Sequence, residues 1–146
     1  MNSIEGETKG RLYYLHLKKD EDVLLEIRRF IKEKNIKNGV VVSGIGTLSS
    51  CSWHGVVTAD FPAKDEFYVV DEEPMELTGL SGVIAEGEPH LHMCVMSYGR
   101  SGQMICGHIE PGCKVLCLAE ISIMETNDIL MCRRIDEDGI NQLQEA

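Results

Sequence analysis

Short runs of β-branched and other apolar residues recur through most of this sequence, separated at brief intervals by Gly, Pro, Asn and Asp. The first group fits pleated strands and the second favours turns. We therefore expect strands near residues 11–18, 39–48, 51–59, 66–71, 74–85, 90–97, 103–109, 113–125 and 129–134. With only one long helical period in the chain, the pattern predicts an α/β fold of the α+β type. In that fold a mostly antiparallel β-sheet packs against one main helix.

The helix is predicted after the first strand. The apolar residues that recur at the spacing of one helix face are Val23, Leu24, Ile27, Phe30 and Ile31. Asp20 or Asp22 can accept hydrogen bonds from the free amides at the helix start, and Asn38-Gly39 supplies a stop. A chain of 146 residues has the length of one domain, so we expect a single domain over residues 1–146.

The net charge of −10 at pH 7 argues against a protein that grips duplex DNA by its phosphates, which needs clusters of cations. Basic side chains gather on the outer side of the predicted helix, at Arg28, Arg29, Lys32 and Lys34. They form either a solvated helix face or an anion-binding face. No segment approaches the roughly 18 apolar residues that span a bilayer, and no secretory pattern opens the chain. We therefore expect a cytoplasmic chain without a membrane partner, whose six cysteines are reduced.

Histidines supply the most informative motif. In His90-Leu91-His92, the two-residue period of a strand sends both imidazoles to one face. Residues 98–102 read as a hairpin turn centred on residue 100, so His108 would lie opposite His92, and Glu110 opposite His90. A one-residue slip in the turn would break this arrangement, so the register is an assumption to check.

Three neutral imidazoles at one point suit zinc or another divalent ion, with a fourth position left for water, a carboxylate or a substrate atom. That coordination is of the catalytic type. The remaining histidines, His16 and His54, have no other histidine at a suitable spacing in the sequence and are interpreted as structural.

Several short motifs follow one another along the chain: a helix beginning Asp20-Glu21-Asp22-Val23, Val-Ser-Gly-Ile-Gly at 42–46, Pro-Met-Glu-Leu-Thr-Gly-Leu-Ser-Gly at 74–82, Pro-His-Leu-His at 89–92 and Gly107-His108. In this order they resemble a known family, the plant and prokaryote conserved (PPC) domain, over nearly the whole length of the chain. The cupin, an alternative with a similar His-x-His motif, lacks support because residues 93–100 contain no carboxylate.

The resemblance implies a compact domain with an antiparallel sheet, assembled as a homotrimer. It also implies that His90, His92 and His108 match the histidines that bind metal in prokaryotic members. The family is labelled as predicted DNA-binding because its plant members join the domain to AT-hooks, and this sequence has no AT-hook. One departure is Cys106-Gly107-His108, where the family usually has Gly-Gly-His. Cys106 is either a fourth, soft ligand or a small buried residue, and we expect the latter.

Three functions remain open. The chain could be a DNA-associated regulator, as the family label implies, although its charge disfavours DNA. It could be a metal-dependent enzyme, of hydrolase or lyase type, acting on a small anionic or carbonyl substrate. In that case Glu110 or Glu88 would carry protons, and Arg100 or Ser101 would hold an anionic group. It could also be a binding module whose metal orders a small-molecule or partner site at a subunit boundary.

The apolar residues of the later strands bear on assembly. They exceed what one helix can cover, so we expect either neighbouring subunits against part of the sheet or a closed barrel. These residues are Met75, Leu77, Leu80, Met93, Val95, Met96, Met104, Ile105, Met124 and Met131.

Overall fold

The computed structural model of the chain describes residues 7–99 and 102–146. Its elements follow one another as β1 (Leu12–Lys18), α1 (Val23–Lys34), β2 (Gly39–Leu48), β3 (Cys51–Val56), β4 (Asp65–Val70), β5 (Met75–Ala85), β6 (Glu88–Ser97), β7 (Met104–Ile109), β8 (Val115–Glu125), β9 (Met131–Ile135) and β10 (Asn141–Glu145). All nine expected strands are present, and β10 is an addition that the sequence pattern did not indicate.

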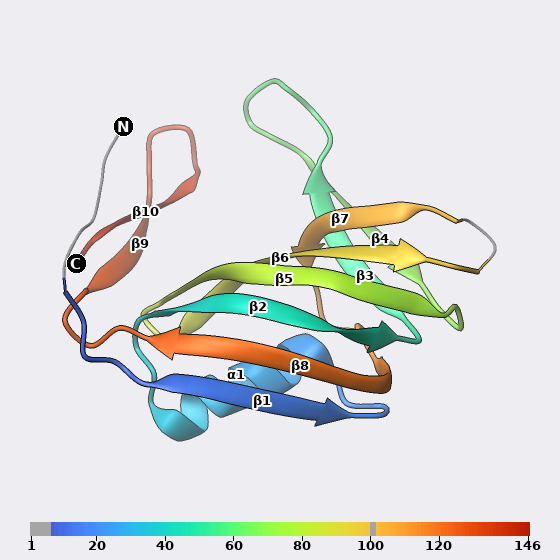
Figure 1. Cartoon of the computed structure of the whole chain (residues 1–146). Helices are drawn as coiled ribbons and strands as arrows, with labels where there is room; N and C mark the ends of the chain where they lie inside the picture. Colours follow the sequence, from blue (N-terminus) through green and yellow to red (C-terminus); the bar gives the residue numbers. More distant parts are fainter. Residues whose placement is uncertain (1–6, 100–101) are drawn as a thin grey trace.

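Eight of these strands form one antiparallel sheet in the order β1-β8-β2-β5-β6-β7-β3-β4. The ninth and tenth pair with each other as a separate hairpin near the chain ends (Figure 1). The expectation of a mostly antiparallel sheet with a single helix is confirmed for the part of the chain that the structure describes.

The helix begins as expected and ends earlier than expected. Asp22 is the N-cap, and its side chain accepts a hydrogen bond from the Leu25 amide at 3.1 Å. The stop is Asn35, in the left-handed conformation, instead of Asn38-Gly39. Asn tolerates that conformation because its short polar side chain bonds locally, so it can end a helix as Gly does.

The helix covers one face of the sheet (Figure 1). Its buried residues, Val23, Leu24, Ile27 and Ile31, join a core with side chains from β1, β2, β5, β6, β7 and β8. Tyr13 packs edge-on against Phe30 with ring centroids 5.2 Å apart, which settles that odd-numbered residues of β1 face the helix. No helix in the described part of the chain has the length and apolar character needed to cross a membrane.

The opposite face of the eight-stranded sheet, which we call the open face, carries exposed apolar side chains. Tyr14 is 80% exposed, Met104 61%, Ile45 54% and Val42 52%. Six of the apolar residues expected to exceed what the helix covers are buried in the core, so the expectation was wrong for Met75, Leu77, Leu80, Met93, Val95 and Ile105. Met104 and Met124 of that set are exposed, together with apolar side chains of β1, β2, β4 and β8.

Candidate metal centre

The hairpin of β6 and β7 places two histidines opposite each other. His92 pairs with His108, and Met96 pairs with Met104, so the register is centred on residue 100 as the sequence predicts. Leu91 and Met93 are buried in the core beneath the sheet. Since side chains alternate along a strand, His90 and His92 project from the open face.

Three imidazoles gather at this point. The ring centroids are 4.9 Å apart for His90 and His108, and 5.5 Å apart both for His92 and His108 and for His90 and His92. Two imidazoles bound to one tetrahedral zinc ion have centroids about 5 Å apart, because each Zn–N bond is about 2.1 Å long. The three rings therefore cluster at one place, but their ligand nitrogens do not all come within 4.8 Å of one another in this structure.

A fourth histidine, from a distant strand, joins the group. β3 pairs with β7 so that His54 lies opposite His108, with ring centroids 4.4 Å apart. The interpretation of His54 as a structural histidine, with no other histidine near it, was wrong. Its partner strand lies more than fifty residues away in the chain, so no local signal in the sequence could have shown the pairing.

Glu110 lies against His54 instead of facing His90. Its Oε1 is 2.7 Å from His54 Nδ1, in a hydrogen bond, and 3.3 Å from His108 Nδ1. The ligand atoms of His54, His108 and Glu110 all lie within 4.8 Å of one another, so these three residues could hold a metal ion. Among the described residues the buried Nδ1 of His108 makes no hydrogen bond of good geometry, although the Glu110 carboxylate lies close to it. Such an orphaned nitrogen, beside a carboxylate and other imidazoles, fits a site built for a cation.

Two of the histidines are held in their neutral form. Burial lowers the pKa of His90 from 6.5 to about 4, and the positive charge of Arg133 adds to the effect. Burial also lowers the pKa of His108, with His54 contributing, while Glu110 opposes the shift. A neutral imidazole has a free lone pair, so both side chains can ligate a metal at neutral pH.

These lowered pKa values make the metal-free protein sensitive to acid. Between pH 6.5 and about 4 the unfolded chain binds a proton on His90 that the folded chain does not, and the lowered pKa of His108 acts in the same direction, so the free energy of unfolding should fall as the pH falls. Urea titrations of wild type and His90→Asn across this range should show a smaller loss for the variant. Parallel pH profiles for the two proteins would contradict this account.

The other residues singled out in the sequence take different places. Cys106 is exposed, so the expectation of a small buried residue was wrong. Glu88 begins β6 and lies 3.9 Å from Arg28, in an ion pair with the helix. Arg100 and Ser101, which were predicted to hold an anionic group, lie outside the described residues.

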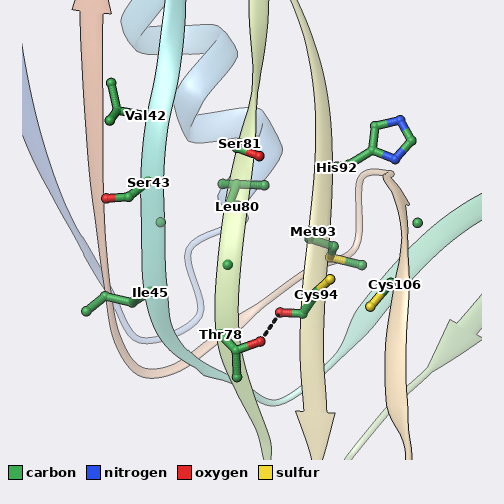
Figure 2. Close-up of a pocket in the computed structure, with 13 residues that line it drawn as sticks. Val42, Ser43, Ile45, Thr78, Leu80, Ser81, His92, Met93, Cys94 and Cys106 are labelled. Carbon is green, nitrogen blue, oxygen red and sulfur yellow. Dashed lines mark hydrogen bonds between the residues drawn. The ribbon is translucent and has the colours of Figure 1, made fainter.

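A cavity of about 450 Å³ opens on the open face beside His92. Its lining includes the hydroxyl side chains of Ser43, Thr78 and Ser81 and the thiols of Cys94 and Cys106 (Figure 2). No Asp, Glu, Lys or Arg is among the described residues that line it. The cavity therefore offers neutral hydrogen-bonding groups and apolar surface next to the histidines.

The sequence and the fold both have relatives. Among curated proteins, the bifunctional protein GlmU of Synechococcus sp. (strain JA-3-3Ab) is 29% identical over 126 residues, which make up 86% of this chain and 19% of that protein. A second GlmU, from strain JA-2-3B'a(2-13), is 27% identical over 126 residues. The chain thus spans about a fifth of the length of the curated relatives it matches.

Solved structures with the same fold come from archaea and bacteria. A metal-containing protein from Archaeoglobus fulgidus has a TM-score of 0.78 and 23% identity, over 99% of this chain and 100% of that one. A plant- and prokaryote-conserved protein from Pyrococcus horikoshii has a TM-score of 0.76 and 23% identity, over 99% of both chains. A candidate DNA-binding protein from Bacteroides thetaiotaomicron has a TM-score of 0.75 and 22% identity, also over 99% of both chains.

The family model of the Plants and Prokaryotes Conserved (PCC) domain matches residues 4–127, which cover most of the chain and include every histidine of the candidate site. The segment beyond residue 127 holds the β9–β10 hairpin. The fold, with its antiparallel sheet and single helix, agrees with that match. The chain belongs to the PCC domain family.

Proposed function

We propose that this chain binds a divalent metal ion, zinc, on the open face of its sheet, with His90, His92 and His108 as ligands. The observation that carries the proposal is the clustering of the three rings, 4.9 to 5.5 Å between centroids, so that small rotations of the side chains would turn their nitrogens toward one ion. The metal-containing protein of Archaeoglobus fulgidus, with its similar fold, adds support.

Glu110 then acts as an orienting carboxylate. Histidine ligands of metals usually give their second ring nitrogen to a carboxylate, a carbonyl or water, which fixes the tautomer and the ring. Glu110 lies 3.3 Å from His108 Nδ1 and hydrogen-bonds His54 Nδ1 at 2.7 Å. An ion bound here would act as a Lewis acid and would lower the pKa of a bound water molecule.

Zinc titration tests the ligand set. We expect His92→Ala to weaken zinc binding by more than about 100-fold, because it removes a direct ligand, beyond the 10–100-fold typical of orienting groups. His16→Ala is the matched control, since His16 lies on β1 with its side chain 56% exposed and 4.0 Å from Glu120. Its affinity should equal that of wild type. An unchanged affinity in His92→Ala would overturn the three-histidine site.

We also propose that the chain assembles as a homotrimer through its open face. In the described structure this face leaves Tyr14, Val42, Ile45 and Met104 more than half exposed. Surfaces of that kind mark interfaces, and closed rings of identical subunits bury them symmetrically. The cavity beside His92 would then lie near a subunit boundary.

A metal-dependent enzyme is the second candidate, favoured by the cavity beside His92. Because the cavity lining is uncharged, the small substrate would be a neutral carbonyl compound more readily than an anion. Benzamide and benzoate have similar shapes and differ in charge, so calorimetry with the zinc-loaded protein separates the two classes. We expect benzamide to bind more tightly, and equal or tighter binding of benzoate would contradict the assignment of a neutral substrate.

Sequence-specific DNA binding by this chain has weaker physical support. The two arginines of α1 are engaged with acidic neighbours: Arg29 pairs with both Glu26 and Glu33, and Arg28 with Glu88. With a net charge of −10, the chain offers few free cations to phosphates. Both observations favour a metal-dependent binding or catalytic role over a DNA-associated one.

A further inference from the structure

Two cysteines face each other beside the histidines. Cys94 on β6 pairs directly with Cys106 on β7, two positions along the ladder from His92 and His108. Figure 2 shows both side chains between the two strands, with their sulfur atoms on the cavity side. The β6–β7 hairpin therefore presents a thiol pair next to a histidine pair on the same face.

The geometry suits a covalent bond between these thiols. Directly opposed residues of an antiparallel pair have Cα atoms about 4.5 or 5.5 Å apart. A disulfide requires Cα atoms roughly 4.4–6.8 Å apart, so the Cα separation expected for a directly opposed pair is suitable. The Cys94 thiol lies near enough to Cys106 to raise the pKa of the Cys106 thiol to about 11.

A second pair of cysteines in the same protein differs from the first in its exposure to solvent. Cys51 and Cys113 also lie close together, but both are completely buried in the core. Their sulfurs lie 3.8 and 3.9 Å from the Met93 sulfur. In contrast, Cys106 is exposed and Cys94 is half-buried. In the single chain a dissolved oxidant can therefore reach the surface pair and not the core pair.

We propose that Cys94 and Cys106 are a redox-active pair that closes to a cross-strand disulfide when the chain meets a small-molecule disulfide. One thiolate attacks a sulfur of the small disulfide, forms a mixed disulfide and releases one small thiolate. The second cysteine thiolate then attacks the protein sulfur of that mixed disulfide and releases the second small thiolate. The two protons lost by the cysteines end on the two released thiols, and the protein is oxidised by two electrons.

The modification would act on the strand pair that carries the candidate metal ligands. His92 and Cys94 are two residues apart on β6, and Cys106 and His108 are two residues apart on β7. A covalent link at this rung ties the two strands together beside the histidine pair. Oxidation of the cysteines would thus restrain the β6–β7 hairpin that carries the candidate metal ligands.

The experiment uses the full-length, reduced, metal-free protein incubated with oxidised glutathione under native conditions. Thiol titration after denaturation should fall from six thiols to four, and the mass should fall by two hydrogen atoms. Trypsin cleaves after Lys64, Arg100 and Lys114, so the disulfide should join fragments 65–100 and 101–114. Cys117→Ser, which removes an exposed cysteine on β8, is the matched control and should still form the link.

The variant Cys106→Ser separates this pair from Cys113, which lies in the same tryptic fragment. It should lose the link and keep a glutathione adduct on Cys94. A link that survives in Cys106→Ser, or a wild type that keeps all six thiols or only glutathione adducts, would overturn the proposal. Because the assay contains no metal, its outcome is independent of the zinc proposal.

Discussion

Gly82→Ala should destabilise the protein strongly. Gly82 lies in β5 opposite Leu91, and a Cβ atom there would be 2.0 Å from the His90 carbonyl oxygen and 2.9 Å from the Leu91 Cα. Its φ of +155° also disfavours a side chain. Overpacking and backbone strain together predict a loss of about 3 kcal/mol or more in the free energy of unfolding. Urea denaturation of the metal-free protein measures this directly.

Gly79→Ala is the matched control in the same strand. A Cβ atom at Gly79 would meet nothing within 4 Å, so the free energy of unfolding should change by no more than about 0.5 kcal/mol. Because Gly82 contacts the backbone of His90, its substitution should also weaken zinc binding, whereas Gly79→Ala should not. Equal stability losses in the two variants would contradict the tight packing of β5 against β6 at the candidate site.

The proposed trimer should fall apart when a charge is placed on the open face. Light scattering should give wild type a mass three times that of the 16.3 kDa chain. Ile45→Glu should give a mass of one chain, because burying an unpaired carboxylate in an apolar interface costs several kcal/mol. Ile45 is 54% exposed in the single chain, so the substitution is compatible with the fold of one subunit.

Ile135→Glu is the control for the open face. Ile135 is 75% exposed and lies on β9, outside the eight-stranded sheet. The trimer mass should persist in this variant. A wild type with the mass of one chain, or an Ile45→Glu variant that remains trimeric, would end the proposal of assembly through this face.

Local patterns predicted most of the fold. The β-branched runs marked the strands, and the apolar period marked the helix, because both depend on neighbours within a few residues in the chain. The symmetry of the turn about residue 100 placed His108 opposite His92 for the same reason. The hairpin strand β10 was missed because four of its five residues are polar, so its pairing with β9 leaves no apolar pattern.

The site was predicted less completely than the fold. His54 and Glu110 meet His108 only because β3 lies beside β7, although β4, β5 and β6 come between them in the chain. Contacts between such distant segments depend on the order of strands in the sheet, and no periodicity encodes that order. The exposure of Cys106 has the same origin, since the open face can be identified only when the position of the helix is known.

The metal content of the purified protein tests the central claim most directly. Plasma mass spectrometry of the protein after incubation with zinc and removal of free metal should find about one ion per chain in wild type. In the double variant His90→Ala/His92→Ala the ion should be lost. If the double variant retains zinc and His54→Ala/Glu110→Gln loses it, the ligands are His54, His108 and Glu110 instead. Either that result or a wild type without metal would contradict the three-histidine centre.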